Sequence, residues 1–140
     1  TRCLSDWSSD VCSSDLVQRH FADGVGAGEL SKAPCLVFNT KDALQATWAR
    51  RLCHRHVELP RHLLPSSQAF VTAAVAGMGW GLHPHALIAQ HLEDGSLVEL
   101  VPNTPLDVPL HWQHARAASS LLDELSRQVL TAARAALLAP

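Results

Sequence analysis

Residues 65–100 read PSSQAFVTAAVAGMGWGLHPHALIAQHLEDGSLVEL, and this stretch decides the fold. Its two serines can cap a helix, SQAFVTAAVAGM, and Gly77 can end that helix. A short strand is expected at Trp80–His83, after which Pro84 opens a second helix, HALIAQHLEDG. Gly95 ends this helix before a strand, SLVELV. The stretch therefore predicts helix, strand, helix and strand in succession.

The same alternation continues on both sides of this stretch. Upstream, Pro34–Asn39 is a short apolar run typical of a strand buried on both faces, and Asp42 can cap the helix ALQATWARRL. Arg61–Leu64 is a further candidate strand. Downstream, Leu106–Trp112 alternates like a strand, and Ala117–Leu138 indicates a long helix with an apolar stripe. Strands that alternate with helices predict an α/β fold whose sheet is at least partly parallel.

Length and composition set the class of protein. A chain of 140 residues with 47% hydrophobic content suits one globular domain, or one domain and a piece of another. The net charge of -2 provides no positive field that would attract nucleic acid or anionic lipid. No apolar run reaches the roughly 18 residues of a membrane span, and no secretion signal is visible. We therefore expect a cytoplasmic protein.

The beginning of the chain differs from the rest. Residues 6–16 read DWSSDVCSSDL, which repeats Ser-Ser-Asp and has neither a helical nor a strand period. This segment also resembles the translation of a common sequencing adapter. We therefore expect residues 1–16 to be a non-native, disordered tail, with the natural protein beginning upstream. A natural Ser/Asp-rich tail is the alternative.

Cysteines and histidines raise the question of a metal site. The cysteines are Cys3, Cys12, Cys35 and Cys53. They show no paired spacing, which favours reduced thiols. Cys53 lies close to His54 and His56, and His83 and His85 flank a proline, but neither group has the second ligand pair of a structural zinc site. We expect no metal.

Cofactor and catalytic motifs are also missing. The glycines at 24, 26 and 28 form GxGxG but precede the strand, and those at 77, 79 and 81 are better explained by a helix end and close packing at a tight turn. No GxSxG motif occurs, and the serines of the core lie at helix starts. We expect no cofactor and no enzymatic activity.

One edge of the sheet is a candidate binding site. Three loops, Phe38–Thr40, Pro65–Ser67 and His83–His85, follow strands, and open α/β sheets bind ligands just past the carboxyl ends of their strands. The helix start at Ser66 and Ser67 could hold a small carboxylate, although capping alone would explain both serines. Asp42 could meet an ammonium or guanidinium group, or only cap its helix.

Three runs carry a resemblance to a known family. They are residues 65–100, KAPCLVFNTKDALQATW at 32–48 and PLHWQHARAASSLLDELSRQVL at 109–130. These runs resemble the effector-binding domain of LysR-type transcription regulators, with a helix-capping Ser-Ser pair, a glycine-turn-strand-Pro element and a closing GxLVxL strand. The chain looks most like the regulators of basic amino acid export that respond to arginine and lysine, also described as inhibitors of chromosome replication initiation. The likeness extends from about His20 to the C-terminus.

The resemblance implies a periplasmic-binding-protein-like domain of two α/β lobes with the effector in the cleft. Residues 17–102 would form a nearly complete second lobe, and residues 103–140 would supply a strand and the C-terminal helix of the first lobe. The family reads DNA through an N-terminal winged helix-turn-helix that these residues lack, and the parent protein would be a homodimer or tetramer. Carried onto this sequence, the effector-binding positions are Asn39, Thr40, Asp42, Ser66, Ser67 and His83.

The resulting hypothesis is a fragment of a transcription regulator that senses lysine or arginine. A basic amino acid would bridge the two lobes and bias the angle between them. The alternatives are a lobe of a bilobed solute-binding protein of a transport system and a small α/β enzyme, for which no convergent catalytic set is found. We also expect the long C-terminal helix to expose an apolar face, because the sheet on which it would pack is incomplete.

Overall fold

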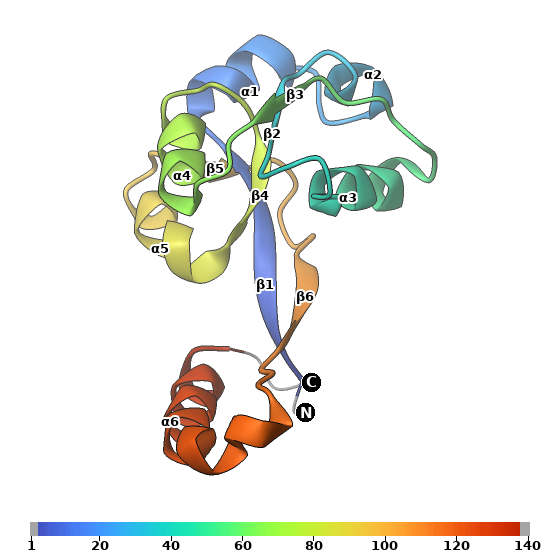
Figure 1. Cartoon of the computed structure of the whole chain (residues 1–140). Coiled ribbons are helices and arrows are strands. Elements are labelled where there is room, and N and C mark those ends of the chain that lie inside the picture. The colour runs from blue at the N-terminus through green and yellow to red at the C-terminus, as the bar shows by residue number, and fades with distance from the viewer. Residues whose placement is uncertain (1–2, 138–140) are drawn as a thin grey trace. The chain divides into compact units, whose positions relative to one another are not determined.

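The computed structural model describes residues 3–137, and its contacts divide the chain into two compact units. The larger unit spans Ser8–Leu106, and the smaller combines the start of the chain with the part after Leu106. Figure 1 shows the course of the chain through both. Each unit is described separately below.

The larger unit is built on short strands. β2 (Cys35–Val37) pairs in parallel with β3 (Arg61–Leu63), with Leu36 opposite His62. β4 (Gly81–Pro84) pairs antiparallel with β1 (Cys3–Cys12), which also pairs antiparallel with β5 (Val98–Glu99). The predicted partly parallel sheet is thus confirmed.

Backbone hydrogen bonds connect the two groups of strands. The Trp80 N–H donates to the Pro34 carbonyl at 3.1 Å, and the Leu36 N–H donates to the Trp80 carbonyl at 2.7 Å. Cys35 and Trp80 accordingly form a parallel bridge. Because Trp80 immediately precedes β4, the strands β3, β2, β4, β1 and β5 follow one another across the unit.

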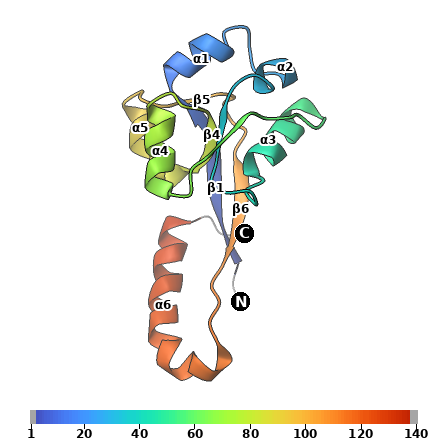
Figure 2. The same cartoon turned by 45° about the horizontal axis from the view of Figure 1, so that its top comes forward.

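Helices cover both sides of these strands. α1 spans Ser14–His20, α2 Ala27–Leu30, α3 Leu44–Cys53, α4 Ser67–Val75 and α5 His85–Glu93. Figures 1 and 2 show α4 and α5 on one side of the strands and α3 on the other. Each side has its own buried apolar cluster, one with Trp48 and Trp80 at a ring separation of 5.2 Å, the other with Phe70 and Ile88.

The start of the chain contradicts one prediction. Residues 3–12 form β1, and Ser8–Cys12 are buried between β4 and β5, so the expected disordered tail is wrong for this part. The composition of this segment does not indicate a strand, because Ser8, Ser9 and Asp10 are polar. Their backbone pairs with Pro84, His83 and Leu82 of β4, and composition does not reveal such pairing.

The remaining predicted elements are largely confirmed, with shorter bounds. The strand predicted over SLVELV is reduced to Val98–Glu99. The helix predicted after Asp42 begins at Leu44 with Ala43 as its N-cap residue, so Asp42 lies one position before the cap. Gly77 and Gly95 end their helices with φ values of +76° and +79°, a conformation that favours glycine.

The smaller unit consists of β6 (Leu106–His111), a 3-10 turn (Arg116–Ala118) and α6 (Ser119–Ala136). β6 pairs with β1. The Trp112 Nε1–H donates to the Ser126 Oγ at 3.0 Å, and this bond joins the end of β6 to α6. The long helix predicted over Ala117–Leu138 is confirmed up to Ala136, whereas Leu138 lies outside the described residues.

Candidate functional site

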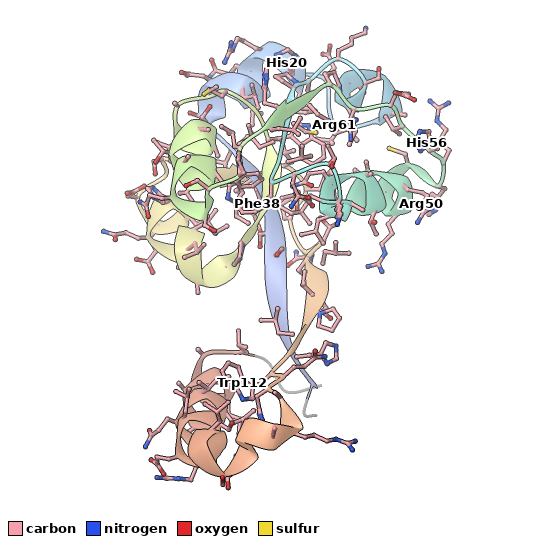
Figure 3. The ribbon with its side chains drawn as sticks, in the orientation of Figure 1. His20, Phe38, Arg50, His56, Arg61 and Trp112 are labelled. Carbon is pink, nitrogen blue, oxygen red and sulfur yellow. The ribbon has the colours of Figure 1, made fainter. Side chains whose placement is uncertain are left out.

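The loops that follow β2, β3 and β4 surround a hollow of about 180 Å³ in the larger unit. Its polar lining comes from three predicted residues, Asp42, Ser67 and His83. Apolar side chains form most of the remaining wall: Phe38, Leu44, Phe70, Val71, Leu82, Pro84 and Leu87. Figure 3 labels Phe38 where β2 ends, between α4 and α3. The hollow thus lies at the predicted edge, beyond the carboxyl ends of the parallel strands.

The two serines have different positions at the start of α4. Ser66 is the N-cap residue, and its Oγ accepts a hydrogen bond from the Ala69 N–H at 3.3 Å. Ser67 begins the helix and lines the hollow. The first N–H groups of a helix have no partner within the helix and carry partial positive charge. The capping interpretation is therefore confirmed for Ser66, and Ser67 brings a hydroxyl to the hollow.

Asp42 stabilises the loop between β2 and α3 through backbone hydrogen bonds. Its Oδ2 accepts from the Phe38 N–H at 2.9 Å and its Oδ1 from the Leu44 N–H at 3.1 Å. An ionised carboxylate has further lone pairs on both oxygens. The carboxylate can therefore hold the loop and still accept a hydrogen bond from a cation in the hollow.

Asn39 and Thr40 lie in the same loop but do not line the hollow. Both are exposed, and the Asn39 Oδ1 accepts from the Lys41 N–H at 2.8 Å in a local turn. These side chains shape the loop, and their predicted contact with an effector stays a prediction.

His83 is the deepest polar residue of the site. Its side chain is 0% exposed, and its ring lies 4.6 Å from that of Phe70. Among the residues that the structure describes, neither ring nitrogen has a hydrogen-bond partner. Burial lowers the pKa of His83 from 6.5 to about 4, so the ring is neutral at ordinary pH.

Two glycines allow close packing, as the sequence suggested: Gly79 at the turn before β4, and Gly81 beside residues that line the hollow. A Cβ added at Gly79 would lie 2.8 Å from the Pro34 carbonyl oxygen, where backbone would have to move. A Cβ added at Gly81 would lie 3.3 Å from Phe70 Cε1 and 3.4 Å from His83 Nε2. The apolar wall of the hollow was not predicted from the sequence.

The residues that could supply other chemistry are dispersed or inert. Within residues 3–137, no group of three or more His, Cys, Asp or Glu side chains could hold a metal ion. Cys12, Cys35 and Cys53 are free thiols, and burial raises the pKa of Cys12 and of Cys35 to about 12. A thiol with such a pKa is a poor nucleophile. The arrangement is suited to holding a small polar molecule.

No helix of the described chain combines the length and the apolar content that crossing a bilayer requires. Residues 9–137 match the family model of the LysR substrate binding domain. The chain belongs to this LysR family. The family match includes residues 9–12 of β1, which lie within the predicted tail.

Named relatives support the same assignment. The chain is 42% identical over 122 residues to the HTH-type transcriptional regulator ArgP of Pseudomonas fluorescens, a match that covers 86% of this chain and 40% of that protein. The chain thus spans less than half the length of its curated relatives. These relatives are named as transcriptional regulators.

Solved structures agree with the LysR fold. The C-terminal domains of a LysR family protein from Agrobacterium tumefaciens match with a TM-score of 0.95 and 46% identity, over 99% of this chain and 69% of that one. The full-length regulator LysG of Corynebacterium glutamicum, solved with its effector Arg bound, matches with a TM-score of 0.76 and 29% identity over 99% of this chain and 48% of that one. The predicted periplasmic-binding-protein-like effector domain is confirmed.

Proposed function

We propose that this chain is the sensory part of a transcription regulator and binds arginine or lysine in the hollow between α4, β4 and the loop after β2. One observation carries the proposal: a carboxylate, a helix N-terminus and a neutral imidazole line one mostly apolar hollow. Arginine is the effector in the LysG structure similar to this chain, which supports the choice of ligand.

The chemistry of the hollow fits each part of a basic amino acid. The α-carboxylate would accept hydrogen bonds from the N–H groups at the start of α4 and from the Ser67 hydroxyl. The methylene groups would lie along apolar side chains such as Leu87 and Phe70. The cationic head group would pair with Asp42, whose carboxylate the backbone holds in place.

The longer protein would join this sensor to a DNA-binding part. In this proposal the larger unit is the second lobe of the effector domain and the smaller unit begins the return to the first lobe. The relatives are named HTH-type transcriptional regulators, which supports an N-terminal helix-turn-helix that reads DNA. In this proposal the parent protein is a homodimer or tetramer in the cytoplasm. The effector would shift the angle between lobes only if its affinity differs between the two arrangements.

Calorimetric titration of the 140-residue chain with L-arginine and L-lysine tests the proposal. Ser67→Ala should weaken binding by about tenfold, the loss expected for one hydrogen bond to a charged group. Ser66→Ala would also remove a helix cap, so its effect on affinity has to be read beside its effect on stability. Ser31→Ala, at the end of α2, is the matched control. Unchanged affinity after replacement of both Ser66 and Ser67 would refute the site.

A further inference from the structure

A second hollow of the larger unit, which we call the α3 hollow, lies beside the last turns of α3. It measures about 340 Å³, above the roughly 300 Å³ at which small-molecule pockets begin. Trp48, Arg51 and Leu52 line it from one face of α3, because residues three and four positions apart are neighbours on a helix. His54 and residues 104–106, where the chain enters β6, complete its wall. None of these residues lines the hollow of the candidate site, so the two hollows are separate.

The wall of the α3 hollow is held in place by the protein itself. Trp48 is 3% exposed, and its Nε1–H donates to the Thr104 carbonyl at 3.1 Å and to the Thr104 Oγ1 at 3.2 Å. The Thr104 hydroxyl donates to the Asp10 Oδ1 at 3.1 Å. Leu106, which closes the wall, is buried. Because these contacts form without a ligand, binding would not have to order this part of the wall.

Two polar side chains of the wall are free to bind a ligand. Arg51 and His54 are exposed, and within residues 3–137 neither has a hydrogen bond or an ion pair through its side chain. Guanidinium donors match the geometry of a carboxylate, and an imidazole can donate an N–H in its neutral and its protonated form. The helix dipole favours basic residues in this last turn, which accounts equally for Arg51 and for its neighbour Arg50. Of these two arginines, Arg51 also borders an apolar hollow.

We propose that the α3 hollow is a second ligand site, which takes a small organic anion whose carboxylate is attached to an apolar body. The apolar body would lie along Trp48, Leu52 and Leu106. The carboxylate would accept hydrogen bonds from Arg51 and His54. The site is distinct from the one proposed for a basic amino acid, because a cationic head group would meet Arg51 and no acidic side chain among the described residues of this wall.

NMR titrations of the ¹⁵N-labelled 140-residue chain with phenylacetate, phenylacetamide and acetate test the inference. Phenylacetamide has nearly the same shape as phenylacetate without the charge, and acetate has the charge without the apolar body. The indole N–H signal of Trp48 is the reporter, because this ring forms part of the wall. Phenylacetate should shift the signal saturably. Each analogue lacks one of the two features that the site recognises and should bind about tenfold more weakly or less.

Two matched variants test the role of the arginine. Arg51→Met removes the guanidinium group, retains most of the apolar stem and should weaken phenylacetate binding by about ten- to a hundredfold. Arg50→Met makes the same change at the neighbouring exposed arginine, labelled in Figure 3, which does not line the hollow and should leave the affinity nearly unchanged. Both side chains are exposed, so both variants should retain the fold, and unchanged spectra away from α3 would verify this.

Several results would overturn the site. Unchanged affinity in Arg51→Met would do so, and so would equal losses in both variants, because the positive charge at the end of α3 would then explain binding. Equal binding of phenylacetamide, shifts confined to the start of α4, or no saturable shift of the Trp48 signal would count equally against it. Saturating L-arginine should leave the affinity for phenylacetate unchanged, and competition between them would refute a second site. Binding of L-arginine itself is measured at the start of α4, so the proposed function stands or falls separately.

Discussion

Replacing Asp10 by asparagine tests the burial of strand β1 in the larger unit. The Asp10 side chain is 1% exposed and belongs to the segment that composition predicts to be disordered. Its Oδ2 accepts from the Val101 N–H at 2.8 Å, and its Oδ1 accepts from the Thr104 hydroxyl at 3.1 Å. The Trp48 Nε1–H donates to the same threonine, so Asp10 fixes the chain just before β6. Asparagine has the same shape and can serve both partners.

The expected gain in stability follows from the pKa of this carboxyl group. Burial raises the pKa of Asp10 from 3.8 to about 6, against the opposing hydrogen bonds from Val101 and Thr104. The Asp10 carboxyl group therefore binds its proton more tightly in the folded state than in the unfolded state. Its ionisation lowers the free energy of unfolding, and this loss of stability is absent below pH 3.8 and complete above about pH 6. A pKa difference of one between the folded and unfolded states corresponds to about 1.4 kcal/mol. Asp10→Asn, which cannot ionise, should therefore stabilise the fold by up to about 3 kcal/mol at neutral pH.

Urea unfolding of wild type and Asp10→Asn between pH 4 and 8 measures this difference. The gain should shrink steadily below pH 6, where wild-type Asp10 becomes protonated. His83 acts in the opposite direction: its folded pKa of about 4 lies below the unfolded 6.5, so it destabilises the fold as pH falls through this range. Asp10→Asn should therefore lose stability on acidification more steeply than the wild type.

The control for this experiment is a second aspartate, which lies at an exposed position. Asp23→Asn removes the same charge at an exposed turn and should leave the curve almost unchanged. If Asp10→Asn instead behaves like Asp23→Asn, and NMR gives Asp10 a pKa near 4, then residues 8–12 are not buried between β4 and β5.

Two further predictions concern packing. Gly79→Ala should destabilise the larger unit by about 1–3 kcal/mol, the usual cost of overpacking, because the added Cβ would lie 2.8 Å from the Pro34 carbonyl oxygen. Urea unfolding measures this loss of stability, and an unchanged free energy of unfolding would contradict the close approach. Leu125 of α6 is a large apolar residue that is 48% exposed. An exposed apolar face favours association between copies of the chain. Leu125→Glu should therefore reduce the self-association that light scattering detects as the protein concentration rises, and equal scattering from the variant and the wild type would contradict this prediction.

Much of the fold could be predicted because its signals are local. Apolar runs such as residues 34–39 mark strands buried on both faces, and the serines before α4 and the glycines after α4 and α5 mark helix ends. β1 could not be predicted from composition. Its polar residues are stabilised by strands that lie some 70 residues or more further along the chain, as the pairing of Ser9 with His83 shows.

The candidate site was predictable only in part. The rule that ligands bind beyond parallel strand ends selects the loops of Asp42, Ser67 and His83, which the structure brings to one hollow. Spacing alone could not show that Asn39 and Thr40 lie outside its wall. Nor could it show that His83 is buried without a partner, because that depends on Phe70 and Gly81, which approach the ring through tertiary packing.

The most direct test of the account is an NMR titration of the ¹⁵N-labelled chain with L-arginine. We predict saturable shifts of the backbone amides of Ser67 and its neighbours at the start of α4, of the Asp42 loop and of the His83 ring nitrogens. Shifts confined to other surfaces, such as the exposed side of α3, or no saturable shifts at all, would contradict the claim that this hollow binds a basic amino acid.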